Sequence, residues 1–243
     1  MSDIKTALEQ IIVKRDGYNE AEAYYEGVNG EVFANQRWFK MFRYEGSDFR
    51  FNFSKTVVDS VLNRLEINQV LAGTPEADAF IDKVWEQSDL RIDINEIHRN
   101  ALVYGDCYAI VWPDATGMMN IDYNSPLTTT IVYDQENPRI KSFAAKMWQT
   151  VTTDGTKLLK LNLYYADRIE KYLGNGDIDS VSMAGNFQLV ETVVNPWNEI
   201  PVFHFRTHKP YGRPEHADAY GPQDAINKLI STHMYSVDYQ GAP

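Results

Sequence analysis

The chain has 243 residues, of which 44% are hydrophobic, and it carries a formal net charge of −11. This length and apolar content are sufficient for a sizeable buried core and exclude an intrinsically disordered chain. The acidic balance excludes a conventional nucleic-acid-binding domain, because such domains hold phosphates through clustered Lys and Arg side chains.

Two short helices are predicted at the N-terminus. The first follows its capping residue Ser2 and ends near Gly17. Its apolar face consists of Leu8, Ile11 and Ile12. The second helix covers residues 19–25 and ends at Gly27. The stretch 33–53, which is rich in Arg, Asn and Phe, fits no regular element.

Three more helices are predicted before residue 106. Ser54 is expected to cap the first, whose apolar residues follow the 3.6-residue period as far as Leu65. The segment 74–76 is a start signal for the second, with Pro at the first helical position. The third starts near Leu90 and closes at Gly105.

The pattern changes to strands after Gly105. Residues 107–112 form a short apolar run that is typical of a buried strand, and residues 114–117 form a turn. Further strands are predicted over residues 118–122, 128–134, 140–150, 157–166 and 201–205. Residues 154–155 and 174–177 have the composition of hairpin turns. Helices followed by an antiparallel meander indicate an α+β fold rather than a doubly wound sheet.

The last predicted element is a helix that follows a loop with two prolines. The loop covers residues 206–220 and is interpreted as a hinge between two units. The helix begins at Pro222. Its apolar face consists of Ile226, Leu229, Ile230, Met234 and Val237. No other predicted element is left to cover this face, so the helix is expected to bury it in an assembly.

The reactive residues of the sequence form no pattern that indicates an active site. His204 and His208 lie on a strand and the following loop, without the helical spacing of metal ligands, and are interpreted as surface imidazoles. His98 is interpreted as a solvated or capped helix residue. Cys107, the one cysteine, excludes an internal disulfide and is expected to be a buried structural thiol.

The dinucleotide fingerprint, the Walker pattern and the nucleophile elbow are all missing from the sequence. We therefore expect a protein that is not an enzyme, with no catalytic residue, metal or cofactor. The N-terminus has no apolar signal segment and no run approaches a membrane-spanning length, so we expect neither secretion nor a membrane partner.

An ordered series of motifs runs through most of the chain. They are residues 24–27, 52–59, 96–105, 195–205, 212–215 and 223–229. In this order and spacing they resemble the portal proteins of tailed bacteriophages, most closely the branch found in long-tailed and actinobacterial phages.

The resemblance implies a ring of about twelve subunits at one vertex of the capsid. Double-stranded DNA would enter and leave through it without sequence-specific binding. Residues 1–205 would form the wing domain, with helices over residues 1–105 and an antiparallel sheet over residues 106–205. Residues 206–220 would be a hinge loop and 221–243 the start of the first stem helix. In the family a clip, a second stem helix and a crown follow, so the chain is expected to be the front portion of a longer protein.

The resemblance also implies partners and a location. The partners are other copies of the chain, the major capsid protein, the scaffolding protein, the terminase large subunit and a head–tail adaptor. The location is the portal vertex of the virion, after assembly in the host cytoplasm. Two other classes stay open: a head–tail or baseplate adaptor without a channel, and an enzyme whose residues converge only in three dimensions.

The candidate site residues lie at the end of the chain. Arg213 and Glu215 match the family's loop before the stem and are expected to form salt bridges within or between subunits; the alternative is a solvated turn pair that contributes little. The residues expected on the channel side of the stem helix are Asp224, Lys228 and Asp238. The residues expected to pack on neighbouring helices are Ile226, Leu229, Ile230 and Met234.

Overall fold

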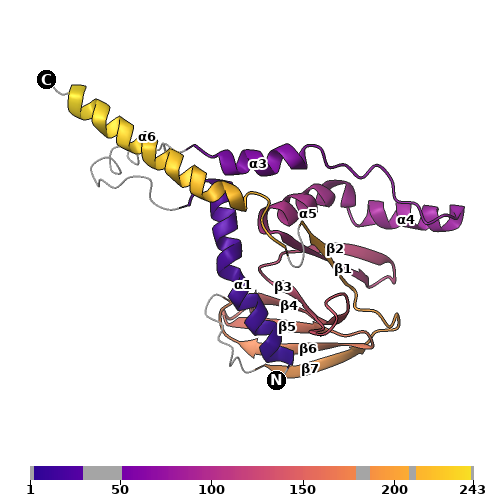
Figure 1. Ribbon diagram of the computed structural model, residues 1–243. Helices are drawn as coiled ribbons and strands as arrows, with labels where there is room; N and C mark the ends of the chain where they lie inside the picture. Colours follow the sequence, from indigo (N-terminus) through magenta and orange to yellow (C-terminus); the bar gives the residue numbers. More distant parts are fainter. Residues whose placement is uncertain (1–2, 30–50, 179–186, 208–211, 242–243) are drawn as a thin grey trace.

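The computed structural model describes residues 3–29, 51–178, 187–207 and 212–241 (Figure 1). Helices come first: α1 (Asp3–Glu26), α3 (Phe53–Leu62), α4 (Pro75–Gln87) and α5 (Leu90–Tyr104). The strands follow: β1 (Asp106–Pro113), β2 (Met119–Asn124), β3 (Thr129–Tyr133), β4 (Lys141–Val151), β5 (Lys157–Tyr164), β6 (Arg168–Asn175), β7 (Gln188–Val194) and β8 (Val202–Arg206). The last elements are the short 3-10 helix η1 (Ala217–Ala219) and α6 (Tyr220–Gly241). This order confirms the predicted α+β class.

Helix α1 is one continuous helix, so the prediction of two short helices was wrong. Gly17 lies in its middle, where a glycine costs about 1 kcal/mol relative to alanine. Burial on both sides outweighs this cost: Ile11 precedes the glycine, Tyr18 follows it, and both are buried. The helix ends before Gly27, as predicted, and this glycine has a left-handed φ of 72°. Ser2, the predicted cap, lies outside the described residues.

The helix boundaries before residue 106 follow the predicted signals with one correction. The cap of α3 is Asn52, whose Oδ1 accepts a 3.0 Å hydrogen bond from the backbone N of Lys55. Ser54, the predicted cap, lies inside the first turn and is fully buried, and the helix ends at Leu62. Helix α4 starts, and α5 starts and ends, as predicted.

The strands form two antiparallel sheets. The first has the order β2-β1-β8 and the second is a meander in the order β3-β4-β5-β6-β7. Strand β8 comes last in the chain but pairs with β1, so the predicted strand 201–205 joins the first sheet. Gly174 was predicted to open a turn. It instead pairs with Leu159 inside the β5–β6 ladder, and the left-handed φ appears at Gly176.

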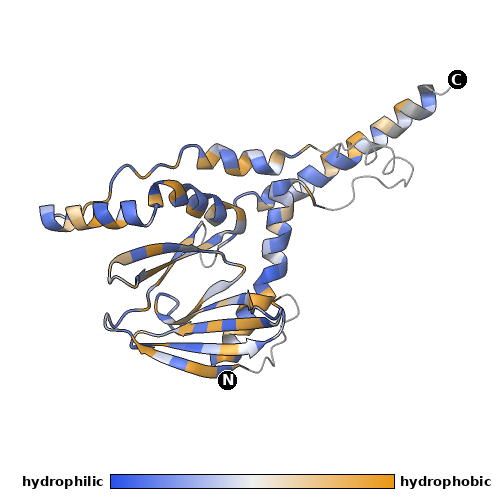
Figure 2. Cartoon of the chain, turned by 180° about the vertical axis from the view of Figure 1, so that it is seen from behind, coloured by the Kyte–Doolittle hydropathy of each residue, from blue (hydrophilic) through white to orange (hydrophobic). Residues whose placement is uncertain are grey.

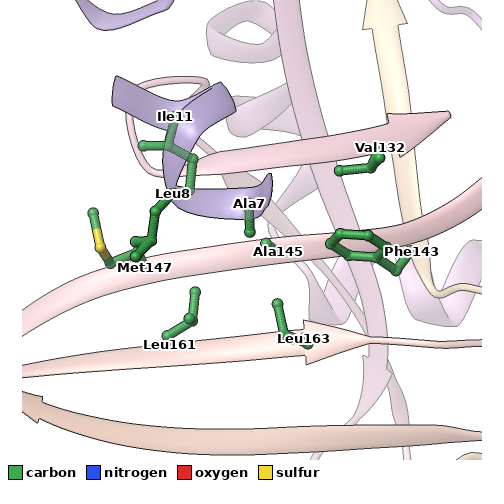
Figure 3. Packing of buried hydrophobic residues seen from close by; sticks show 9 residues of the cluster. All are labelled: Ala7, Leu8, Ile11, Val132, Phe143, Ala145, Met147, Leu161 and Leu163. Atoms are coloured by element: carbon green, nitrogen blue, oxygen red, sulfur yellow. The ribbon is translucent and has the colours of Figure 1, made fainter. Parts of the chain in front are cut away.

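Helices and sheets stack in layers. The inner faces of the two sheets enclose one core, which includes Tyr108, Ile110, Ile131, Ala144, Tyr164 and Val202. The outer face of the five-stranded sheet is sealed by the N-terminal half of α1 (Figure 3). This core consists of Ala7, Leu8, Ile11, Val132, Phe143, Ala145, Met147, Leu161 and Leu163. The leucines that alternate in the predicted strand 157–166 thus point to one side, as their period requires.

Two further clusters attach helices α3 and α5. Cys107 packs with Leu90 and Ile97, which places α5 on the outer face of the three-stranded sheet. The C-terminal half of α1 packs on α3 and α5 through Tyr18, Tyr25, Val58, Leu102, Val103 and Tyr104. Helix α1 therefore runs from the five-stranded sheet to the base of α6 (Figure 1).

Helix α6 projects away from the body of the molecule (Figure 1). It starts at Tyr220, two residues before the predicted Pro222. Hydrophobic residues recur along its length (Figure 2), and two of them, Leu229 and Val237, are 69% and 56% exposed. None of the described helices combines the length and the hydropathy that crossing a membrane requires.

Candidate functional site at the base of helix α6

A polar clamp fixes the base of α6 to the segment that leads into α3. Gln223 and Asn227 lie one turn apart and are both buried. The Oε1 atom of Gln223 accepts a 2.6 Å hydrogen bond from the backbone N of Phe53, and its Nε2 donates to the carbonyl of Phe51. Asn227 Oδ1 accepts a 3.1 Å bond from the backbone N of Phe51. Hydrogen bonds between two side chains of α6 and the main chain of Phe51 and Phe53, rather than an apolar face, therefore attach α6 on this side.

The end of α1 holds the same helix on another side. The rings of Tyr24 and Tyr220 are stacked, with centroids 3.8 Å apart and an angle of 5° between their planes. Asp224, predicted to face the channel, accepts hydrogen bonds from Tyr24 Oη at 2.7 Å and Asn29 Nδ2 at 2.9 Å. Burial, together with the hydrogen bond to Asp224, raises the pKa of Tyr24 to about 12, so its hydroxyl remains a donor at neutral pH.

The loop before α6 carries the two predicted ion-pair residues. Arg213 pairs with Asp218 within the chain, and both side chains are exposed, as in pairs that contribute about 0–1 kcal/mol. The backbone N of Glu215 donates to the carbonyl of Leu102 at 2.9 Å. The loop thus bonds through its main chain to the last turns of α5.

His216 lies in this loop and is fully buried. Its Nε2 donates a 2.9 Å hydrogen bond to the carbonyl of Ala21, and its ring lies between those of Tyr25 and Tyr220. Burial lowers the pKa of His216, so the ring is neutral at physiological pH. Sequence reasoning did not single out this residue, because a lone histidine in a loop gives no signal of burial.

A pair of glycines brings the loop against the end of α5. Gly105 has a left-handed φ of 80°, and a Cβ added to it would overlap the backbone of Gly212 and Arg213. A Cβ on Gly212 would in turn overlap the carbonyl of Gly105. Both positions therefore need glycine for close main-chain approach.

The carboxylate of Asp106 lies next to this glycine contact and is only 3% exposed. Its Oδ2 accepts a 2.6 Å hydrogen bond from Tyr18 Oη, and its Oδ1 accepts bonds from His204 Nε2 at 2.7 Å and from the backbone N of Gly212 at 3.0 Å. The ammonium of Lys14 is 3.8 Å away. Asp106 thus joins α1, β1, β8 and the loop before α6.

The predicted surface position of His204 was wrong, because its side chain is 4% exposed. When Nε2 donates to Asp106, Nδ1 can accept from Tyr133 Oη, which lies 2.9 Å away. Burial by itself would raise the pKa of Asp106. The hydrogen bond from His204, the charge of Lys14 and the Tyr18 hydroxyl outweigh burial and lower this pKa, so the carboxylate is ionised.

The remaining predicted site residues lie further along α6. Lys228 and Leu229 are exposed, and Ile226, Ile230 and Met234 are half-buried. The side chain of Asp238 lies outside the described portion of the structure, and so does His208.

In the portion of the chain that the structure describes, no group of three His, Cys, Asp or Glu side chains could hold a metal ion. Cys107 is the buried structural thiol that the sequence predicts, and burial raises its pKa to about 12. Burial also lowers the pKa of the half-buried His98. The contacts at the base of α6 fix the position of this helix on α1, α3 and the loop before it.

The comparison with known families gives one match that spans almost the whole chain. The model of the family described as "Phage portal protein, SPP1 Gp6-like" matches residues 6–241. No curated protein matches the chain.

Proposed function

This chain belongs to the phage portal protein family, and we propose that it is a portal subunit: about twelve copies form a ring at one capsid vertex, through which DNA is packaged and ejected and to which the tail connects. The observation that carries this proposal is the family match over residues 6–241. The family is a structural one, and the protein acts as a conduit without catalysis of its own.

The exposed length of α6 supports the ring. Leu229 and Val237 are apolar and largely exposed, and a helix that projects alone needs a partner for such side chains. In a closed ring one face of a subunit contacts a different face of the next, so a single helix can supply one side of every contact. Ile226, Leu229, Ile230 and Met234 are the proposed contacts with the neighbouring copy.

The opposite side of the helix is the proposed channel wall. Asp224 is exposed in spite of its bonds to α1, and Lys228 is exposed too, so both can face a channel; Asp238 is proposed beside them. Arg213 and Glu215 are proposed to lie at the subunit boundary. With a net charge of −11 the subunit does not attract phosphates, which favours passage of DNA without binding.

The proposed partners follow from this role. They are the major capsid protein, the scaffolding protein, the terminase large subunit and a head–tail adaptor, at the portal vertex of a virion that is assembled in the host cytoplasm. Residues 1–205 would form the wing, 206–220 the hinge loop and 221–243 the beginning of the stem.

Native mass spectrometry and negative-stain electron microscopy test the proposal. We expect closed rings of about a dozen copies, and no measurable affinity of these rings for duplex DNA at moderate salt. A chain that stays monomeric at high concentration, or that forms an open complex of a few copies, refutes the ring. Tight, salt-sensitive binding to duplex DNA refutes the role of a passive conduit.

A further inference from the structure

Strand β7 has unused main-chain groups along one side. It is the last strand of the five-stranded sheet, and among the described strands it pairs with β6 alone. The backbone N of Asn195, directly after β7, donates to the carbonyl of Asp167. Because hydrogen-bonding groups alternate in direction along an antiparallel strand, the amides of Thr192 and Val194 point away from β6. Neither amide has an acceptor in the described part of the chain.

The side chains of β7 do not protect this edge. Soluble proteins usually guard an edge strand with Lys, Pro, a bulge or a covering segment, since a bare edge pairs with other chains. Six of the seven residues of β7 are exposed, and the strand contains neither Lys nor Pro. Val190 forms a bulge, but residues 191–194 stay in regular register with β6. The apolar Val194 is 76% exposed. These four residues are therefore open to a further strand.

The segment 66–71, called here the α3–α4 arm, has the opposite deficiency. It connects α3 to α4 without helix or strand, and every one of its residues is exposed. In the described part of the chain, no hydrogen bond is made by the main chain of these six residues. Ile67, Val70 and Leu71 are apolar, and a strand conformation would place Ile67 and Leu71 on one face. The arm is thus a strand-like segment without a sheet.

The arm and the β7 edge complement each other, but not within one chain. Each needs main-chain partners and cover for apolar side chains, and the six residues of the arm are sufficient to pair with residues 191–194. In one subunit they lie at opposite ends of the molecule, with the three-stranded sheet between them (Figure 1). Pairing therefore requires two copies. It joins two different surfaces of identical chains, which is the type of contact that closes a ring.

We propose that the α3–α4 arm of one copy adds a strand to the β7 edge of the next copy. The amides of Thr192 and Val194 then donate to carbonyl groups of the arm, and each five-stranded sheet gains a sixth strand from its neighbour. The proposal rests on the proposed ring and names one of its contacts.

Photo-cross-linking identifies what the arm contacts. p-Benzoylphenylalanine in place of Asn68 is irradiated in rings assembled from an equal mixture of ¹⁴N- and ¹⁵N-labelled chains. We expect cross-links between the arm and β7 with mixed isotope composition, which only a contact between copies produces. The same probe at Lys83, exposed on α4, is the control and should not reach β7. Rings in which the arm is cross-linked within single chains alone, to another segment, or not at all overturn the pairing and leave the ring itself intact.

Removal of single amides gives a second measurement. Thr192→Pro and Asn68→Pro each delete one main-chain donor, and we expect ring formation to fall at least about tenfold because the loss is repeated at every contact. Thr192→Ala and Asn68→Ala keep the amide and should assemble like the wild type. The amide of Thr192 is not used in the β6–β7 ladder, so circular dichroism of the isolated subunit should be unchanged.

If Thr192→Pro does not fold, Asn68→Pro decides, because the arm has no regular structure to lose. Equal ring formation by the folded proline variant and its alanine control overturns the pairing alone. A wild-type chain that forms no rings refutes the proposed function as well.

Discussion

Replacing Asp106 by asparagine should destabilise the junction between the body and α6. Asparagine keeps the shape of the side chain but offers one acceptor oxygen in place of two. That oxygen can face Tyr18 or the pair formed by His204 and Gly212, but not both sides at once. At least one buried donor then meets an amide NH₂ group instead of an acceptor.

The magnitude follows from the number of bonds that are lost. A hydrogen bond to a charged group contributes about 1.5–3 kcal/mol, and one buried donor left without an acceptor costs about 1–3 kcal/mol more. Lys14 is one-third exposed and adds little when it loses its partner. We therefore expect Asp106→Asn to lower the free energy of unfolding by about 3–5 kcal/mol.

Urea unfolding, followed by tryptophan fluorescence and circular dichroism, measures this change. Asp82→Asn, on the exposed side of α4, is the matched control and should stay within about 0.5 kcal/mol of the wild type. A loss below about 1 kcal/mol for Asp106→Asn would show that the carboxylate is not the anchor that its geometry indicates.

Three other perturbations test neighbouring contacts. Gly105→Ala forces a side chain into a left-handed position against the loop backbone, and should lower the free energy of unfolding by about 2 kcal/mol or more in the same urea assay. Burial lowers the pKa of His216, so below about pH 6.5 the unfolded chain binds a proton that the folded chain does not, and the free energy of unfolding should fall as the pH falls. His216→Gln should reduce this fall, measured as urea midpoints at pH 7.5 and 5.5. An unchanged pH dependence in this variant would contradict the assignment to His216. Gln223→Ala should speed hydrogen exchange of the Phe53 amide about tenfold; equal exchange rates would mean that the clamp is not formed in solution.

Local signals in the sequence were sufficient for most element boundaries. Thr74 with Pro75 begins α4, and Gly105 ends α5, because caps and left-handed glycines act within a few residues. Gly17 is a false stop signal, since the cost of one glycine is smaller than the burial on either side of it. The cap at Asn52 was missed because Ser54, two residues later, offers the same chemistry.

The contacts at the base of α6 lay beyond sequence reasoning for a different reason. Asp106 meets Tyr18, 88 residues earlier, and Gly212, 106 residues later. Residues this far apart in the sequence come into contact only when the two sheets and α1 are assembled. Gln223 and Asn227 stand four residues apart in a motif of the family resemblance, and this spacing is the one local sign that they share a face. The prediction instead took the apolar residues on the other side of the helix as its contact surface.

Helix α1 connects two distant parts of the subunit because it is uninterrupted. At 24 residues and about 1.5 Å per residue it is roughly 36 Å long, comparable to the diameter of a small domain. One end packs on the five-stranded sheet through Leu8 and Ile11. The other end contacts the loop before α6 through Ala21 and α6 itself through Tyr24. A displacement of α6 is therefore expected to reach the five-stranded sheet through one uninterrupted helix. Gly17, near the middle of α1, is the position at which this helix is expected to bend most easily, because glycine has the lowest helix propensity of its residues.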